Sequence, residues 1–475
     1  MQERLERLFQ LRKHQTTVKT ELASGATMFL ASLYILFVNG IVLAETGMPE
    51  QGVFIATALT AAVCTLFMAL FANMPMLVAP GTSINALFAY VVCIGAGYHW
   101  KEALAIVFLA GLLHVLLAIS PARKAMISAV PEHIGIAAGA GLGVFIAQLA
   151  VRNAGILEGR RILDGAAAYE MPRVFADFNL SLVIFLLAAV VMLVMLAWAR
   201  RGGEKAAVYK YAALPISILV TTFICLPLNF ARVGEATAFT GTLWRDFREV
   251  AFSFFGTPGL GSVFASPGTA ARTLLVVLIL AFTNILDSIS GLLGLGYMEK
   301  SGIFDHKEME LFKSEPMTSR MDRAVIANSF GGVLAPLFGS PTAVLYLETA
   351  TGILLGGRTG LAGVAAGICF LLCIPLAWLF RLIPTEAVAP AMILAGGSMM
   401  TRVGSINWRK LEEAVPAFVM ILMIPLTNSV LDGISIGLLC YLAVVKRGKG
   451  GTRVSPVLYC VAGLYILVKV LETLV

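Results

Sequence analysis

The chain has 475 residues, of which 59% are hydrophobic and only 13% are charged, and its formal net charge is +7. Because soluble domains average about 25% charged residues, a chain of this length and composition cannot cover a water-exposed surface. The composition therefore excludes a soluble enzyme, a nucleic-acid-binding protein and a disordered chain, and it indicates a polytopic membrane protein.

Apolar segments recur along the whole sequence. A membrane-spanning helix needs about 20 mostly apolar residues. Segments near this length lie at 24–43, 53–73, 79–97, 102–119, 134–153, 180–199, 208–228, 271–297, 322–338, 342–356, 359–380, 385–401, 412–428 and 430–446. We therefore predict an all-α membrane protein with about fourteen transmembrane segments, because backbone N–H and C=O groups inside a bilayer must be hydrogen-bonded within the segment. The tail, 447–475, contains a further apolar stretch at 455–475 that either spans the membrane or lies at its surface.

The basic residues indicate the orientation. With the N-terminus inside, most of the 35 Lys and Arg residues fall in cytoplasmic segments. These segments are 1–20, 120–134, 200–211, 298–323, the turn at Arg358, 401–410 and 446–453. This is the positive-inside pattern of an integral, multi-pass protein of the plasma or inner membrane, with a cytoplasmic lead at 1–20. Charge dispersed among short loops does not favour nucleic acid as a partner.

Two of the segments are interrupted at membrane depth. The third, within 74–90, and the tenth, within 338–352, each open with a cluster of Pro, Gly, Ser and Thr. Pro80 and Pro341 remove backbone donors, so we predict a short extended break in each. Such backbone is tolerated only inside the protein or beside a water-filled cavity.

The two breaks occupy equivalent places in two sets of seven segments. Seven is odd, so two such repeats have opposite orientations in the membrane. We therefore predict a 7+7 inverted repeat, at 21–228 and 271–446, with an extracytoplasmic loop at 229–270 between them. Interrupted segments at matching positions are typical of a transporter binding site. The alternative interpretation is two proline kinks in packed helices.

Few polar residues lie within the apolar segments. Intramembrane ionisable residues are costly and are functional by default. Asp287 lies in the eighth segment, and Asn284 precedes it by three residues, so both project from about the same helix face. Glu348 follows the break in the tenth segment and Asn85 follows the break in the third, where the first N–H groups of a short helix are available to a ligand.

Other polar residues have structural alternatives. A buried Asn85 either contacts the substrate or only ties the two broken segments together. His114, alone on the fourth segment, is typical of a core histidine whose hydrogen bonds are satisfied. Asp432 favours a turn or a helix cap. The seven cysteines lie in apolar stretches and favour packing roles.

Several stretches resemble a known family. They are residues 16–21, 34–39, 45–48, 71–73, 79–81, 85–88, 321–324, 346–349 and 356–360. With them, almost the whole chain resembles the nucleobase–cation symporter-2 permeases, and specifically the AzgA-like adenine/guanine/hypoxanthine branch. The family's acid of the eighth segment falls on Asp287, its glutamate of the tenth on Glu348 and its asparagine of the third on Asn85. The chain departs from the branch pattern at Asn284, Ser290, Asn328 and Pro341, which removes two carboxylates.

The resemblance implies fold and activity. It implies a core domain built from 21–120 and 271–380, and a gate domain built from 134–228 and 385–446. It also implies proton-coupled purine uptake by a protein that is often a homodimer. The partners would then be a small-molecule nucleobase, a proton and the lipid bilayer.

A binding site for a flat, neutral base needs adjacent hydrogen-bond donors and acceptors along the edge of the base and an aromatic ring that stacks on its face. Asp287 and Glu348 can each accept two ring N–H bonds, and either can carry the coupling proton. Backbone N–H groups at 83–85 and 346–348 supply donors, and Phe88 or Tyr346 supplies a ring face. The candidate substrate-binding residues are Asp287, Glu348, Asn85, Asn284, Ser83, Phe88, Tyr346 and Thr349.

Alternatives from other classes stay open. One is a transporter of a different planar nitrogenous metabolite, and another is an anion exchanger or channel on the same scaffold, which the carboxylates argue against. An enzyme is disfavoured, because no phosphate-binding loop, HExxH pair or Ser/His/Asp set is present in a usable context. The sequence predicts no catalytic residue, no metal site and no cofactor.

Overall fold

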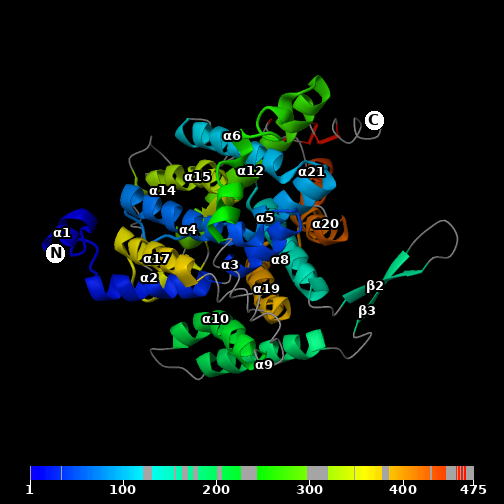
Figure 1. The fold of residues 1–475 in the computed structure, drawn as a ribbon. Helices are drawn as coiled ribbons and strands as arrows, with labels where there is room; N and C mark the ends of the chain where they lie inside the picture. The colour runs from blue at the N-terminus through cyan, green and yellow to red at the C-terminus, as the bar shows by residue number, and fades with distance from the viewer. Residues whose placement is uncertain are drawn as a thin grey trace.

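The computed structural model shows a bundle of helices with a few short strands (Figure 1). It describes residues 2–33, 35–120, 131–153, 157–162, 169–174, 180–200, 206–225, 243–296, 319–346, 348–376, 384–427, 430–445, 456, 458–459, 462–463 and 465–466. The predicted tail segment, 455–475, therefore lies mostly outside the described residues. Within it, the Tyr465 hydroxyl donates a hydrogen bond to Asp432 Oδ1 at 2.9 Å.

The first half of the chain, to residue 225, contains three of the four described strands and most of the longest helices. Its elements are α1 (Gln2–Phe9), α2 (Val18–Ser32), α3 (Ile35–Ala44), α4 (Glu50–Ala72), β1 (Val78–Pro80), α5 (Thr82–Ala86), the π-helix η1 (Leu87–Gly95), α6 (Trp100–Ile119), α8 (Glu132–Asn153), β2 (Leu157–Ile162), β3 (Tyr169–Val174), α9 (Leu180–Arg200) and α10 (Ala206–Cys225). The segment predicted at 24–43 is thus divided between α2 and α3.

The second half begins with a structured connection. Residues 243–250 are helical, and the 3₁₀ turns η3 (Ser253–Phe255) and η4 (Ser262–Phe264) follow. The remaining elements are α12 (Pro267–Gly296), α14 (Arg320–Ser329), α15 (Gly331–Phe338), β4 (Ala343–Leu345), α16 (Thr349–Leu354), α17 (Gly360–Cys373), η5 (Ile374–Leu376), α19 (Thr385–Met399), η6 (Met400–Ser405), α20 (Leu411–Thr427) and α21 (Val430–Val444). The segment predicted at 322–338 is two helices, α14 and α15.

Among the described residues, five helices are long and apolar enough to cross a membrane. They are Glu50–Ala72, Trp100–Ile119, His133–Arg152, Ser181–Trp198 and Gly268–Ile285. Shorter apolar helices lie at Ile84–Gly95, Ile216–Cys225, Gly360–Cys373 and Asp432–Val444. On α9 and α10, large apolar side chains such as Leu193 and Phe223 are exposed, as expected for a surface that faces lipid.

Helix ends coincide with residues suited to end a helix. Thr17 caps α2 by accepting a hydrogen bond from the Thr20 backbone N–H. Ser319 and Asp322 form a reciprocal capping box at the start of α14. Gly339 ends α15 with φ of +88°, a left-handed conformation that favours glycine.

Helices from the two halves of the chain pack against each other in two groups (Figure 1). In one group, α17 lies on α2 and α4, α15 lies on α4 and α6, and α12 lies on α6. In the other, α8 packs against α19 and α20, and α21 packs against α20. At the α6–α15 contact, a Cβ on Gly111 would lie 2.2 Å from the Gly332 carbonyl oxygen, so this close approach requires a glycine.

A β-hairpin lies between α8 and α9, where the sequence predicted only helices and loops. Strands β2 and β3 pair antiparallel and project from the helices (Figure 1). Their register sets Glu158 opposite Arg173 and Arg161 opposite Glu170. The sequences of the two strands have no apolar alternation from which the strands could be predicted.

A partly buried polar cluster joins the N-terminal lead to both halves of the chain. We call it the junction cluster, and it consists of Glu21, Asn73, Arg320 and Arg358. The Glu21 carboxylate is fully buried and accepts hydrogen bonds from the backbone N–H groups of Arg358 (2.8 Å), Thr359 (3.3 Å) and Ala362 (3.1 Å). It therefore places a negative charge at the N-terminus of α17, where the helix dipole favours it.

The other members of the junction cluster satisfy backbone groups from several helices. Asn73 ends α4 in a left-handed conformation, accepts from the Gly360 N–H at 2.9 Å and donates to the Phe9 carbonyl at 3.1 Å. Arg320 donates to the carbonyl oxygens of Asn73 and Arg358. Burial lowers the pKa of the Arg358 guanidinium from its ordinary value, and the Glu21 charge opposes this shift.

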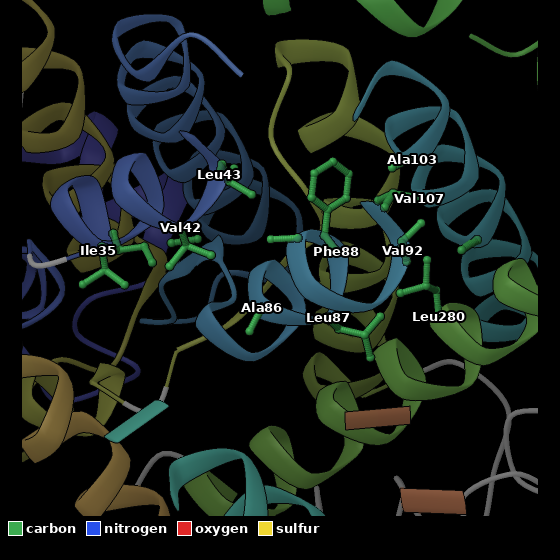
Figure 2. Close-up of a cluster of buried hydrophobic side chains, with 14 of the residues drawn as sticks. Ile35, Val42, Leu43, Ala86, Leu87, Phe88, Val92, Ala103, Val107 and Leu280 are labelled. Carbon is green, nitrogen blue, oxygen red and sulfur yellow. The ribbon is translucent and has the colours of Figure 1, made fainter. Parts of the chain in front are cut away.

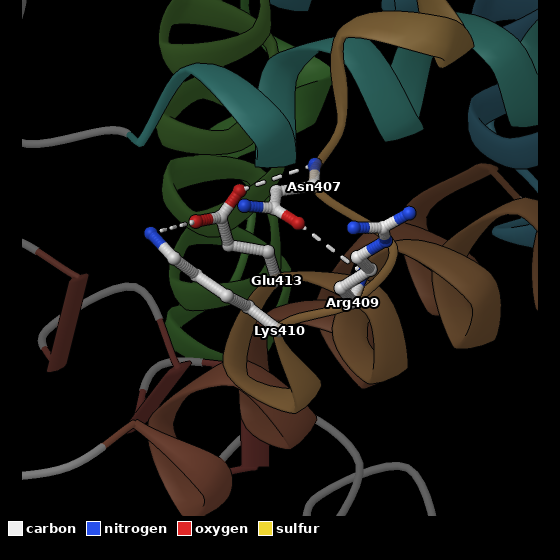
Figure 3. Close-up of polar contacts among 4 residues, drawn as sticks. All are labelled: Asn407, Arg409, Lys410 and Glu413. Atoms are coloured by element: carbon white, nitrogen blue, oxygen red, sulfur yellow. Dashed lines mark hydrogen bonds and ion pairs between the residues drawn. The ribbon is translucent and has the colours of Figure 1, made fainter.

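A surface turn between η6 and α20 carries a contrasting set of polar contacts (Figure 3). The Glu413 carboxylate accepts from the Asn407 backbone N–H at 3.4 Å and lies 3.3 Å from Lys410 Nζ. The Arg409 backbone N–H donates to the Asn407 side-chain oxygen at 3.2 Å. These contacts lie at the end of the basic stretch 401–410, which the sequence analysis predicts on the cytoplasmic side.

Candidate functional site

The two interrupted segments meet in a short antiparallel pair. Strands β1 and β4 align Val78 with Leu345, Ala79 with Val344 and Pro80 with Ala343. The pair is extended by a hydrogen bond of 3.2 Å from the Gly81 N–H to the Thr342 carbonyl. The extended backbone predicted around Pro80 and Pro341 is thus buried and largely paired inside the protein, as membrane depth requires.

Two of the predicted site residues hold this strand pair together. The Tyr346 hydroxyl donates to the Pro80 carbonyl oxygen, and the Tyr346 backbone N–H donates to the Leu77 carbonyl at 2.9 Å. The fully buried Thr349 accepts from the Leu77 N–H through Oγ1 at 3.0 Å. Both side chains therefore fix the backbone on which the other candidates stand.

Asn85 lies in α5, directly after β1. Its side chain is only 1% exposed, and neither Oδ1 nor Nδ2 has a hydrogen-bond partner among the described residues. Its backbone N–H donates to the Gly81 carbonyl at 2.8 Å, so the residue is held in the first turn after the strand. Because buried polar groups are almost always paired, an amide with both groups unused indicates a place for a ligand or water.

The acids of the candidate site lie on the second half of the chain. Glu348 is half-buried in the turn between β4 and α16. Asp287 belongs to α12, between Asn284 and Ser288, but its side chain lies outside what the structure describes, as does that of Ser83 in α5. The structure therefore sets the two acids on elements that flank β4, since α12 packs against that strand.

Asn284 connects α12 to the strand pair. It is fully buried, and its Nδ2 donates to Thr342 Oγ1 at 3.3 Å, while Oδ1 has no partner among the described residues. Thr342 directly precedes β4, and its carbonyl accepts a hydrogen bond from the N–H of Gly81, which directly follows β1. Asn284 is therefore linked to the ends of both strands. Asn284 thus presents an unused acceptor next to both strands.

Phe88 lies one turn beyond Asn85, at the start of η1. Its ring is fully buried among apolar side chains that include Val92, Ala103 and Val107 (Figure 2). In this arrangement the ring contributes to the hydrophobic core. Its role as a stacking wall stays a prediction.

The structure brings together three further polar residues that the sequence did not place in the site. His114 of α6, Ser288 of α12 and Asn328 of α14 form a buried chain, in which Asn328 Nδ2 donates to Ser288 Oγ and His114 Nε2 lies 3.5 Å from the same oxygen. The available signal was that His114 and Asn328 are isolated polar residues in apolar segments, which gives no information on their partners.

Four buried residues thus share one property, and we call them the central polar set. Each has at least one side-chain atom without a hydrogen-bond partner among the described residues: Asn85 (Oδ1 and Nδ2), Asn284 (Oδ1), Asn328 (Oδ1) and His114 (Nδ1). Amides and an imidazole offer donors and acceptors without formal charge. In the described part of the chain, no group of three or more His, Cys, Asp and Glu residues is arranged to hold a metal.

Comparison with known proteins identifies the family of this chain. The family model for xanthine/uracil-type permeases, described as a permease family, matches residues 19–436. The chain belongs to this nucleobase–cation symporter permease family. The resemblance seen in the motif stretches is therefore confirmed, and the chain is a permease and not an enzyme.

Curated relatives of this permease cover nearly its whole length. It is 32% identical to the adenine permease AdeP of Escherichia coli, over 98% of this chain and 95% of the relative. It is 29% identical to the guanine/hypoxanthine permease PbuO of Bacillus subtilis, over 97% and 99% of the two chains. Relatives at this distance are purine nucleobase permeases, so the permease is an integral, multi-pass membrane protein of a nucleobase-transporting family.

A solved structure supports the fold. The transmembrane domain of the cyanobacterial bicarbonate transporter BicA matches with a TM-score of 0.59 and 16% sequence identity, covering 89% of this chain and 97% of that domain. At this identity the likeness shows a shared transporter fold, and it carries no information on the substrate.

Proposed function

We propose that this permease is a secondary active transporter that imports a purine nucleobase of the adenine, guanine or hypoxanthine class by proton symport. The observation that carries the proposal is the buried amide of Asn85, whose donor and acceptor are both unused beside the β1–β4 pair. An asparagine amide pairs with adjacent donor and acceptor groups of a base, as its bidentate contact with adenine illustrates. Family membership and the purine permeases among the relatives support the same substrate class.

The strand pair also supports the proposed architecture. β1 and β4 come from the interrupted segments of the two halves and run antiparallel, as a 7+7 inverted repeat requires. In this proposal the core comprises 21–120 and 271–380, and the gate comprises 134–228 and 385–446. Movement of gate against core exposes the site alternately to each side of the cytoplasmic membrane. The N-terminus lies inside and the permease works as a homodimer.

The two acids on either side of β4 couple the movement of a proton to the transport of the base. Asp287 and Glu348 are the candidate proton carriers, and two interacting acids titrate as a pair. A carboxylate that accepts N–H groups of the base binds it by charge-assisted hydrogen bonds, so proton and substrate occupancy are linked at one place. Asn284, Ser83, Tyr346, Thr349 and Phe88 complete the proposed surroundings of the base.

An anion exchanger is the competing function, because the BicA domain shares the fold. A buried anion needs a positive partner, since burying an unpaired charge is costly. Residues 78–95 and 339–354, which contain both breaks and the short helices after them, include no Lys or Arg. The charge of these stretches therefore favours a neutral substrate.

Uptake into liposomes tests the proposal. Purified permease, reconstituted with an inward proton gradient, is expected to accumulate one or more radiolabelled bases from a panel of adenine, guanine, hypoxanthine, xanthine and uracil. A protonophore should abolish the accumulation, and a sodium gradient should not replace the proton gradient. Transport of no base, or of bicarbonate alone, rejects the substrate class, and accumulation driven by sodium alone rejects proton coupling.

Two variants assign the acids in the same assay. Asp287→Asn is expected to lose accumulation against a gradient, because the amide cannot carry a proton. Glu348→Ala is expected to lose base binding. Full accumulation in the first variant rejects the proton role of Asp287, and unchanged substrate affinity in the second rejects the ligand role of Glu348.

A further inference from the structure

Ser288 is the centre of a buried hydrogen-bonded chain that connects three helices. Its hydroxyl on α12 donates to the Asn284 carbonyl oxygen at 2.8 Å. It accepts from Asn328 Nδ2 on α14, and His114 Nε2 on α6 lies 3.5 Å away. The side chains of Ser288, Asn328 and His114 are almost completely buried, so water does not compete for these contacts.

The hydroxyl proton decides which groups donate. A serine hydroxyl has one proton and two lone pairs. Because the proton of Ser288 goes to the Asn284 carbonyl, both lone pairs are available to accept from Asn328 Nδ2 and from His114 Nε2. The contact is therefore satisfied when His114 carries a proton on Nε2.

The same turn of α12 is also fixed on its other side. Asn284 Nδ2 donates to Thr342 Oγ1 at 3.3 Å, and the Thr342 carbonyl accepts from Gly81. The chain of contacts thus runs from α6 and α14, through one turn of α12, to both strands of the β1–β4 pair. Asp287 lies within that turn, between Asn284 and Ser288.

We propose that His114 and Asn328 are positioning residues, which act through Ser288 to hold the α12 turn of Asn284 and Asp287 against β4. This inference rests on the proposed function of that turn in binding the base. Binding groups must be held within a fraction of an ångström by supporting hydrogen bonds and packing. Side chains without formal charge provide that support at a lower desolvation cost than buried ions.

The experiment compares the KM and maximal rate of base uptake in proteoliposomes. Ser288→Ala and His114→Leu are each expected to raise KM about tenfold, with a much smaller effect on the maximal rate, because about one positioning hydrogen bond is lost. Thr283→Val is the matched control: its hydroxyl, on the same helix, donates to the Ile279 carbonyl of its own helix at 2.9 Å and to no other helix among the described residues. This control is expected to keep the wild-type KM.

A conservative variant separates positioning from packing. His114→Gln retains an N–H donor at about the reach of Nε2 and is expected to restore most of the affinity that His114→Leu loses. Ser288→Cys, with a weaker donor and acceptor, should give an intermediate KM and serves as the second variant if Ser288→Ala does not fold. Thermal stability of each detergent-solubilised variant is measured in parallel.

The outcomes separate this inference from the proposed function. A wild-type protein that transports no base rejects the proposed function. If the wild type transports a base and the Ser288 and His114 variants keep its KM, the positioning role is overturned alone. Lower thermal stability with an unchanged KM, or failure of His114→Gln to improve on His114→Leu, likewise overturns it.

Discussion

Two polar regions of this permease differ in how far their hydrogen-bonding groups are used. In the junction cluster, the Glu21 carboxylate accepts three backbone N–H groups, and both amide groups of Asn73 are bonded. In the central polar set, each residue has at least one side-chain atom without a partner among the described residues. Glu21 is as buried as the residues of the central polar set, whereas Asn73 and Arg358 are partly exposed. Glu21 and the central polar set therefore differ in pairing and not in burial.

The difference separates a structural role from a binding role. A buried polar group without a partner costs about 1–3 kcal/mol, and hydrogen bonds such as those of Glu21 and Asn73 return that cost. The junction cluster therefore stabilises the fold where the N-terminal lead, α4, α14 and α17 meet. The central polar set leaves part of the cost unrecovered until a ligand or water arrives. Variants in the two regions should consequently have opposite effects on stability and transport.

The largest expected effect is on the junction cluster. Glu21→Ala should lower the free energy of unfolding by about 3 kcal/mol, because three backbone N–H groups lose their acceptor and Arg358 loses a nearby opposite charge. The measurement is the thermal unfolding midpoint in detergent. Glu21→Gln, which keeps one acceptor oxygen, should fall between the wild type and Glu21→Ala. A midpoint within a degree of the wild type would show that the junction cluster does not stabilise the fold.

Asn85→Leu should give the opposite pattern. Removing a bidentate contact to a base costs about 1–3 kcal/mol, so substrate affinity should fall by roughly 5- to 150-fold. The midpoint of thermal unfolding should stay level or rise, because two unpaired polar atoms leave the interior. Asn73→Gly is the comparison variant, since glycine tolerates the left-handed backbone there, while an amide with both groups bonded is lost, and it should mainly destabilise. Equal destabilisation by both substitutions contradicts the distinction between the two regions.

Arg320→Lys tests whether geometry matters within the junction cluster. Arg320 Nη2 donates to the carbonyl oxygens of Asn73 and Arg358, while Nη1 lies 3.4 Å from His14 Nδ1. The ammonium of a lysine has one nitrogen and cannot occupy the positions of both guanidinium nitrogens. We expect a loss of about 1–2 kcal/mol in the free energy of unfolding, with substrate affinity retained. Unchanged thermal unfolding would mean that a positive charge alone suffices at this position.

Part of the fold and part of the candidate site could be predicted from the sequence. Pro80 and Pro341 lack a backbone donor, so breaks in their segments were predictable, and the structure has a strand at each place. Asn85 and Glu348 were predictable as candidates because each polar side chain directly follows a break. The stretches 16–21, 71–73 and 356–360, which contain Glu21, Asn73 and Arg358, also stood out, although nothing in the sequence indicated that these residues meet in the junction cluster.

The remainder depends on contacts between distant residues. Pairing of β1 with β4 joins residues more than 250 positions apart, and a propensity or a periodicity carries no information on such a partner. His114 was interpreted as a core histidine with satisfied hydrogen bonds, but only its Nε2 has a partner in the described residues, through Ser288. Its role could be inferred only after α6, α12 and α14 were seen to converge.

The smallest expected effect is at the surface turn before α20. Lys410 and Glu413 form an ion pair of 3.3 Å, but their side chains are 66% and 25% exposed. Water and salt screen such a pair, so Lys410→Ala should change the free energy of unfolding by less than about 0.5 kcal/mol. Thermal unfolding at low and high ionic strength measures it, and any difference from the wild type should vanish at high salt. A loss as large as that of Arg320→Lys would show that the number of polar contacts, and not their burial and pairing, determines stability in this permease.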